Sequence, residues 1–264
     1  MSEFTSFFAW LPFLSFLPAG ILSIMRGEKQ SRLLIALAFG CFVSFGWFYY
    51  LVSLKYSQNF SLTIFSTIFV TSLIYLAFCL FSKANKLLAG LLSPLMLYLA
   101  FLGGLSFSFE SKEGIGDYDI WILLHVVFAM LTYALINLAA LAALAVTIKE
   151  TVLKRKSKSV IADRLPSVLD GNLLQFNYMF YAEILLGIGL ITGITINIVQ
   201  QKEVVHLDHK TLLTTLAFLG IALLIYLHRR MGLRGRKASH WILIAYLLVT
   251  AGYPGVKFVS GLLL

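Results

Sequence analysis

Eight long runs of apolar residues divide this chain of 264 residues, and short polar segments separate them. Each run is long enough for a helix to cross a hydrocarbon core of roughly 30 Å. Backbone polar groups in lipid must be hydrogen-bonded within the protein, and these runs are too long for barrel strands. We therefore predict an all-α polytopic integral membrane protein, a bundle of eight transmembrane helices that forms one membrane domain over residues 1–264. The predicted helices are residues 4–25, 33–54, 62–82, 87–109, 121–148, 176–200, 211–228 and 241–262.

The composition supports this fold class. Hydrophobic residues make up 59% of the chain and charged residues only 12%, which excludes a soluble domain. The net charge of +9 comes from basic residues in the short loops, so it indicates membrane orientation and not binding to nucleic acid. The lipid bilayer is the expected partner. No nucleophile with its base, phosphate-binding loop, dinucleotide motif or zinc site is recognisable, so no motif supports an enzyme.

The distribution of basic residues predicts the orientation. Sixteen lysines and arginines follow the first, third, fifth and seventh runs, whereas four follow the second, fourth and sixth. Because cytoplasmic loops are enriched in these residues, we expect both termini outside the cytoplasm. The longest connection, residues 149–175, is expected to be a solvated cytoplasmic loop followed by a short surface helix that Pro166 caps.

Three histidines are expected at the outer face. His125 lies one turn inside the fifth helix, with Trp121 and Phe128 at helical spacing, so that this face suits a flat apolar ligand. The alternative is a histidine that is hydrogen-bonded within the bundle. His206 and His209 precede or begin the seventh helix and form an HxxH pair, which alone is a weak metal motif or part of a solvated loop.

Taken together, these histidines suggest an iron site. His125 and His209 are candidates for the two axial positions on one haem iron, if the fifth and seventh helices are neighbours. We prefer His209 to His206 because it is close to the helix start. His228 lies about 28 Å from His209 along the same helix, and its simplest interpretation is that it lies with Arg229 and Arg230 at the opposite headgroup layer. We assign no function to His240.

Glu183 is the one carboxyl group well inside a predicted span. It is protonated, paired with a neighbouring helix or part of a proton path, and we expect a structural role. The glycines Gly187, Gly189 and Gly193, like Gly40 and Gly46, indicate surfaces of close helix packing.

Three segments of the chain resemble a known family. They are LHVVFAMLTYALINLAAL around His125, LPSVLDGNLLQ before the sixth helix, and the stretch from HKTLL through YLHRR and GLRGRKA to YPGVKFV. In this order they are similar to the cytochrome c assembly protein superfamily, in particular its YpjD- and HemX-like branch (CcsA/HemX/YpjD-like inner membrane proteins). The resemblance covers roughly residues 120–262, and the HKT match begins at His209.

The resemblance implies a role with haem. In CcsA-type cytochrome c synthases, two outer histidines flank a tryptophan-rich segment and ligate haem, and another histidine lies within the membrane. His125 matches the first outer histidine and His228 the membrane one. The segment HLDHKTLL has no tryptophan, and no histidine lies in the tail from Leu262 to Leu264. The resemblance therefore implies binding or handling of haem b, without a complete synthase activity in this chain alone.

The expected location is the bacterial inner (cytoplasmic) membrane, and the expected partners are haem and proteins of cytochrome c maturation or haem biosynthesis. The alternative is a haem-free accessory subunit or regulator of a cation or metabolite transporter, in which Glu183 would matter and the histidines would be structural.

Overall fold

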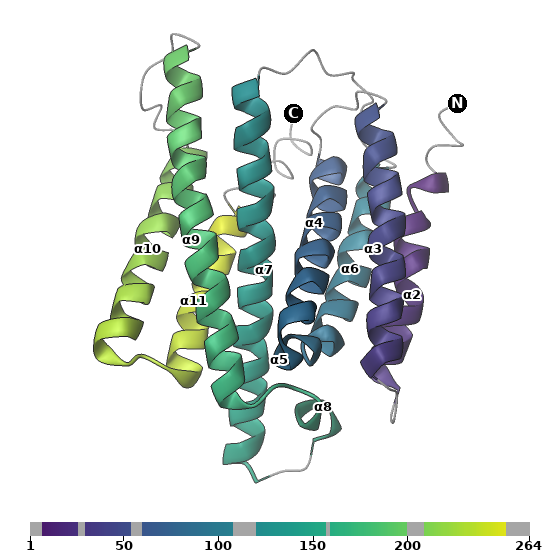
Figure 1. Ribbon diagram of the computed structural model, residues 1–264, viewed down its shortest axis with the longest axis vertical. Coiled ribbons are helices and arrows are strands. Elements are labelled where there is room, and N and C mark those ends of the chain that lie inside the picture. The colour runs from purple at the N-terminus through teal and green to yellow at the C-terminus, as the bar shows by residue number, and fades with distance from the viewer. Residues whose placement is uncertain are drawn as a thin grey trace. The chain divides into compact units, whose positions relative to one another are not determined.

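The computed structural model describes residues 7–25, 30–53, 60–107, 120–156, 159–199 and 209–251. Within these ranges every regular element is a helix, so the all-α prediction is confirmed. The chain divides into two compact units (Figure 1). Unit 1 comprises residues 1–116, 158–166 and 257–264, and unit 2 comprises residues 117–157 and 167–256. The expected single membrane domain stays a prediction.

Unit 1 is built from helices that pack through close approaches. Its helices are α2 (Leu11–Ile24), α3 (Gln30–Ser53), α4 (Phe60–Phe81), α5 (Lys83–Lys86), α6 (Ala89–Phe107) and α8 (Val160–Asp163). α2 packs against α3 and α6, and α4 packs against the same two helices. A Cβ atom on Gly40 of α3 would lie 2.5 Å from the ring of Phe16 of α2, so only glycine allows this approach. Gly46 has no neighbour within 4 Å, and its predicted packing role is wrong.

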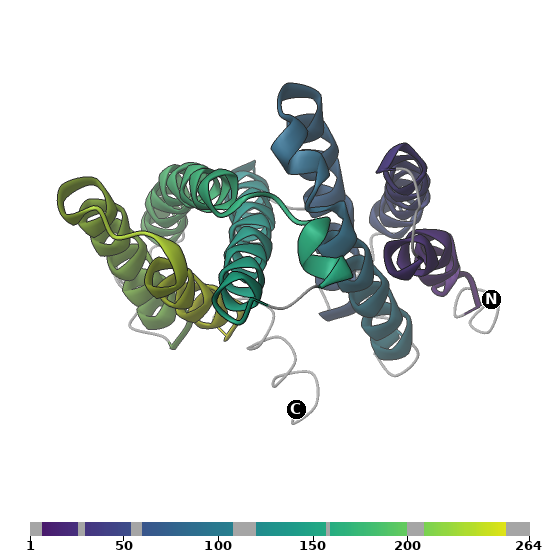
Figure 2. The ribbon, with the colours of Figure 1, turned by 90° about the horizontal axis from the view of Figure 1, so that it is seen from below.

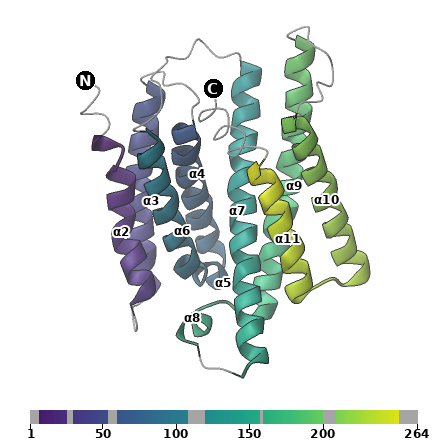
Figure 3. The same ribbon diagram turned by 180° about the vertical axis from the view of Figure 1, so that it is seen from behind.

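Unit 2 is a ring of four helices. They are α7 (Ile120–Lys154), α9 (Val168–Val199), α10 (His209–Met231) and α11 (Gly235–Thr250). α7 packs against α9 and α11, and α10 packs against the same two helices. α7 and α10 therefore lie on a diagonal of the ring, which Figure 2 shows along the helices. Figure 3 shows α11 from behind, between α7 and α10.

Unit 2 has two ends, which we name after their histidines. The start of α7, the end of α9 and the start of α10 lie at the His125 end (Figure 1). The end of α7, the start of α9, the end of α10 and the start of α11 lie at the His228 end.

Six of the described helices are long and apolar enough to cross a membrane, namely α3, α4, α6, α7, α9 and α10. They correspond to the second to seventh predicted spans, and the chain is a helical membrane protein. α2 has 14 residues and α11 has 16, so the first and eighth predicted spans stay predictions.

The connection predicted between the fifth and sixth spans differs from the structure. α7 continues to Lys154, so the predicted loop residues 149–154 are helical. Its 35 residues extend over about 52 Å, so its charged last turns reach beyond a hydrocarbon core of roughly 30 Å.

The predicted separate surface helix is also wrong, because α9 begins at Val168 and already contains it. Ser167 explains this start: its hydroxyl accepts a hydrogen bond from the Asp170 backbone N–H at 3.1 Å and donates to Asp170 Oδ2 at 2.7 Å. A serine in this position stabilises a helix N-terminus.

Candidate functional site

His125 is held in one orientation by α9. The side chain is half-buried, and its Nδ1 lies 3.0 Å from the Gly189 carbonyl oxygen and 3.2 Å from Thr192 Oγ1. The Thr192 hydroxyl donates to the same carbonyl at 2.9 Å. Because a carbonyl oxygen only accepts, His125 Nδ1 carries the hydrogen and donates it to Gly189. The other ring nitrogen, Nε2, then has a free lone pair, and no described residue hydrogen-bonds to it.

Glycines of α9 make room for this arrangement. A Cβ atom on Gly193 would lie 3.3 Å from His125 Cε1, and one on Gly189 would lie 4.0 Å from Phe128 Cβ. Gly187 faces Phe218 of α10 in the same way, at 3.4 Å. The predicted close packing on α9 is therefore confirmed at Gly193, where it places the imidazole against the α9 backbone, whereas Gly187 and Gly189 lie at ordinary contact distances.

The aromatic neighbours of His125 lie one turn to either side of it on α7. Phe128 is half-buried and lies near Gly189. Trp121 is 40% exposed at the first turn of α7. The face therefore offers an imidazole between two aromatic side chains, of which the outer one is open to its surroundings.

For His209, the second predicted ligand, the structure gives the position of the backbone only. His209 is the first residue of α10 and so lies at the His125 end of unit 2. We expected α7 and α10 to be neighbours if their histidines form an axial pair. In the structure α10 instead faces α7 across the ring. Facing helices of a four-helix bundle also supply joint ligand sites. His206 lies outside the described residues.

His228 lies at the opposite end and is packed inward. Its ring stacks on Phe176 of α9, with 3.4 Å between the ring centroids and an angle of 14°. Its Nδ1 donates to the Leu233 carbonyl oxygen at 2.7 Å. His228 shares the last turn of α10 with Arg229 and Arg230, but its side chain packs against α9. Its predicted place in the headgroup layer stays a prediction. Arg229 lies over the ring of Phe180, 5.0 Å from its centroid.

A buried polar cluster at the His228 end joins α9 to α11. Asn172 Oδ1 accepts hydrogen bonds from Gln175 Nε2 at 2.8 Å and from the Gly235 backbone N–H at 2.9 Å. Ser239 donates to Gln175 Oε1 at 3.0 Å. We did not predict this cluster, although two amides three residues apart in LDGNLLQ were a usable signal.

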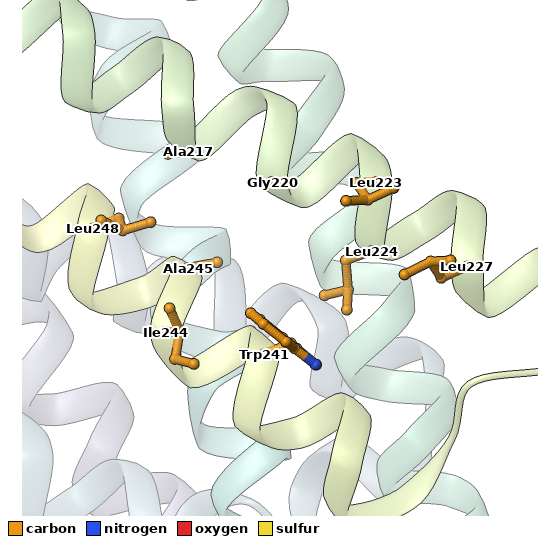
Figure 4. Close-up of a pocket in the computed structure, with 9 residues that line it drawn as sticks. All are labelled: Ala217, Gly220, Leu223, Leu224, Leu227, Trp241, Ile244, Ala245 and Leu248. Carbon is orange, nitrogen blue, oxygen red and sulfur yellow. The ribbon is translucent and has the colours of Figure 1, made fainter.

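The groove between α10 and α11 and the side chain of His240 are not part of the proposed histidine site. An apolar groove of about 210 Å³ runs between α10 and α11, and the indole of Trp241 projects into it (Figure 4). His240 is exposed and bonds to the Arg236 carbonyl oxygen of its own helix at 2.6 Å. Within the described residues, no three His, Cys, Asp or Glu side chains are grouped to hold a metal ion.

Comparisons with known proteins relate the chain to one family and to two bacterial proteins. Residues 30–264 match the family described as cytochrome C assembly protein. The chain is 35% identical over 211 residues, 80% of its length, to 78% of an Azospirillum brasilense protein named "Uncharacterized 28.8 kDa protein in nifR3-like 5'region". It is 29% identical over 136 residues, 51% of its length, to 49% of Protein HemX from Brevibacillus brevis. No solved structure gives a significant match.

Proposed function

Since the chain belongs to the cytochrome c assembly protein family, we propose that it binds haem b at the His125 end of unit 2 and passes it to, or holds it for, proteins of cytochrome c maturation or haem biosynthesis. The similarity to Protein HemX supports a role related to haem. In this proposal the chain alone is not a complete cytochrome c synthase.

The orientation of His125 is the observation that carries the proposal. A histidine that binds iron through one ring nitrogen commonly donates its other N–H to a backbone carbonyl, which sets the tautomer and orients the ring. Nδ1 of His125 has this bond to Gly189, and Nε2 is the nitrogen left for a metal. The residues present therefore fit an iron porphyrin, whose iron would supply the site for an imidazole ligand.

We assign the other roles by position. His209 is the proposed second axial ligand because it begins the helix that faces α7, and His206 is the nearest substitute in the sequence. Trp121 and Phe128 would cover the porphyrin. His228 has the same kind of Nδ1 bond and would hold haem only if a second haem binds at the opposite end of unit 2.

Absorption spectroscopy tests this proposal. Protein expressed with a haem precursor should show a Soret band and a pyridine haemochrome of the b type. His125→Ala and His209→Ala should each lose haem or change a low-spin spectrum to a high-spin one. His240→Ala is the matched control, because that imidazole is exposed and bonds only within its own helix. Wild-type spectra in both ligand variants would contradict the site.

The distribution of basic residues supports an outward-facing His125 end in a bacterial inner membrane. Reporter fusions after Arg32, Lys86, Lys158 and Lys237 should then report the cytoplasm, and fusions after Ser57, Lys112 and the C-terminus the outside. A cytoplasmic C-terminal fusion would reverse the assignment.

The second candidate function is a haem-free accessory subunit or regulator of a transporter. It is favoured by Glu183, whose two carboxyl oxygens are buried without a hydrogen-bond partner among the described residues. The absence of a Soret band after expression with the haem precursor would favour this candidate over haem binding.

A further inference from the structure

Glu183 lies in the middle of α9, on the side that faces α10. Phe180, one turn earlier, packs beneath Arg229 of α10. Gly187, one turn later, faces Phe218 of α10. Residues three and four apart lie on one face of a helix, so Glu183 lies between these two contacts. The residues one turn to either side of it on this face are a phenylalanine and a glycine, and the glycine faces another phenylalanine.

The carboxyl group has no partner in these surroundings. Both oxygens are buried and have no hydrogen-bond partner among the described residues. Beyond His209 and Lys210, which begin α10, the described helices packed against α9 carry these charged and titratable side chains: His125, Lys149, Glu150 and Lys154 on α7, His228, Arg229 and Arg230 on α10, and Arg236, Lys237 and His240 on α11, with the phenols of Tyr133, Tyr226 and Tyr246. All the imidazoles and formally charged groups in this set belong to the first two or the last two turns of their helices.

Three of these groups are engaged elsewhere. His125 donates to Gly189 and His228 donates to Leu233. The Arg229 guanidinium lies over Phe180, one turn along α9 from Glu183. An ionised carboxylate without a partner is far more costly in such a setting than a neutral acid.

A metal ion is a poor partner for this carboxyl group. Sodium, magnesium and calcium ions need several oxygen ligands at once. The contacts on either side of Glu183 are made by Phe180, Gly187 and Phe218 and supply no side-chain oxygen. A proton needs only the carboxyl group itself.

We propose that Glu183 is a proton-binding site: it carries a proton in the resting protein, takes no metal cation, and pairs with Arg229 when it ionises. This site does not depend on bound haem, so it stands or falls separately from the haem proposal.

Modification by dicyclohexylcarbodiimide tests the site in the full-length protein in liposomes. This apolar reagent reacts with protonated carboxyl groups: the O–H adds across a C=N bond, and an acyl shift leaves an N-acylurea that contains every atom of the reagent. Glu150 is the internal control, since it accepts a hydrogen bond from the Arg236 backbone N–H and lies 4.0 Å from Lys154. Peptide mass spectrometry measures both positions.

At neutral pH, Glu183 should be modified about tenfold faster than Glu150, because its apolar setting keeps it protonated. The rate at Glu183 should fall as the pH rises, and excess sodium, potassium or magnesium ions should leave it unchanged. Equal or slower modification of Glu183, or protection by any of these cations, would overturn the proposal.

The role of Arg229 has its own test. Removal of a cation disfavours the carboxylate, so modification of Glu183 in Arg229→Gln should persist to higher pH than in the wild type. Arg230→Gln is the matched control, because Arg230 lies on the same turn and carries the same charge, whereas Arg229 is the arginine that lies over Phe180. A profile in Arg229→Gln that equals the profile of Arg230→Gln, or that moves to lower pH, would overturn the pairing.

Discussion

Units 1 and 2 use buried polar side chains in different ways. Three serine and threonine hydroxyls of α4 and α6 in unit 1 bond to their own helix: Ser66 and Thr67 donate to the Thr63 carbonyl oxygen at 2.8 Å, and Ser93 donates to Ala89 at 2.8 Å. The Tyr75 hydroxyl of α4 reaches only the short adjoining helix α5, where it donates to the Asn85 carbonyl oxygen at 3.1 Å. In unit 2, His125, Asn172 and Ser239 bond to a different helix. A hydroxyl bonded within its own turn does not hold two helices in register, whereas a bond between helices does.

The candidate haem ligands lie in unit 2, the unit whose polar side chains bond between helices. In the middle of unit 1 the helices are held by shape, as at Gly40 and Phe16. In unit 2 the same bonds that align the helices also orient imidazoles. The comparison teaches that a membrane bundle acquires a precise site where its polar groups reach across helices.

The largest effect should come from the packing of unit 1. Gly40→Ala places a Cβ atom 2.5 Å from the Phe16 ring and should lower the unfolding free energy by about 2–3 kcal/mol. Gly46→Ala, in the same helix with nothing within 4 Å, should be neutral or stabilise by up to about 1 kcal/mol. Detergent unfolding followed by circular dichroism measures both. Equal losses in the two variants would break the view that shape holds unit 1.

A smaller loss is expected from the polar cluster of unit 2. Asn172→Leu leaves the Gly235 N–H and the Gln175 amide without their acceptor and should cost about 1–2 kcal/mol. Ser66→Ala in unit 1 removes only a bond within α4 and should change stability by less than about 0.5 kcal/mol. Unfolding curves with a larger loss for Ser66→Ala would reverse the comparison.

Thr192→Val should have a modest effect on the His125 site. It removes the hydroxyl that lies 3.2 Å from His125 Nδ1 but keeps the Gly189 carbonyl, so the expected cost is about 0.6 kcal/mol of unfolding free energy. Thr195→Val is the matched control, because the Thr195 hydroxyl bonds only to Ile191 of its own helix. A loss of unfolding free energy in Thr192→Val alone would support the view that bonds between helices stabilise unit 2. An equal loss in Thr195→Val would contradict this view at the His125 site.

The smallest effect is expected for Glu183→Gln. A neutral carboxyl group and an amide have nearly the same shape, and the carboxyl oxygens have no described partner. The unfolding free energy should therefore change by less than about 0.5 kcal/mol, and expression should be nearly unchanged. A folded variant that has lost function in cells would show that the proton matters and would favour the transporter alternative.

The helices could be predicted because the backbone N–H and C=O groups of each segment in lipid must form hydrogen bonds within that segment. The length of the apolar run was therefore a sufficient signal for six spans. The errors in the helix boundaries lie at polar segments, where this requirement of lipid does not apply. The charged turns up to Lys154 are helical outside the hydrocarbon core, and the Ser167 cap was overlooked at the start of α9.

The orientations of the histidines could not be predicted. The partner of His125 is a carbonyl 64 residues away, and a backbone carbonyl has no sequence signature. His228 stacks on a phenylalanine in another helix, and such contacts depend on the register in which two helices pack. The sequence pattern therefore identified which imidazoles to consider, and the folded bundle shows which of their nitrogens remain available.

The diagonal placement of α7 and α10 has a calorimetric consequence. Each of these helices packs on both α9 and α11, so a ligand held by α7 and α10 together would connect all four helices of the ring. Its binding free energy would then appear as resistance to unfolding, about 2.7 kcal/mol when the free ligand is at one hundred times its dissociation constant. In a heating scan, the transition of unit 2 should move upward with haem concentration while that of unit 1 stays in place.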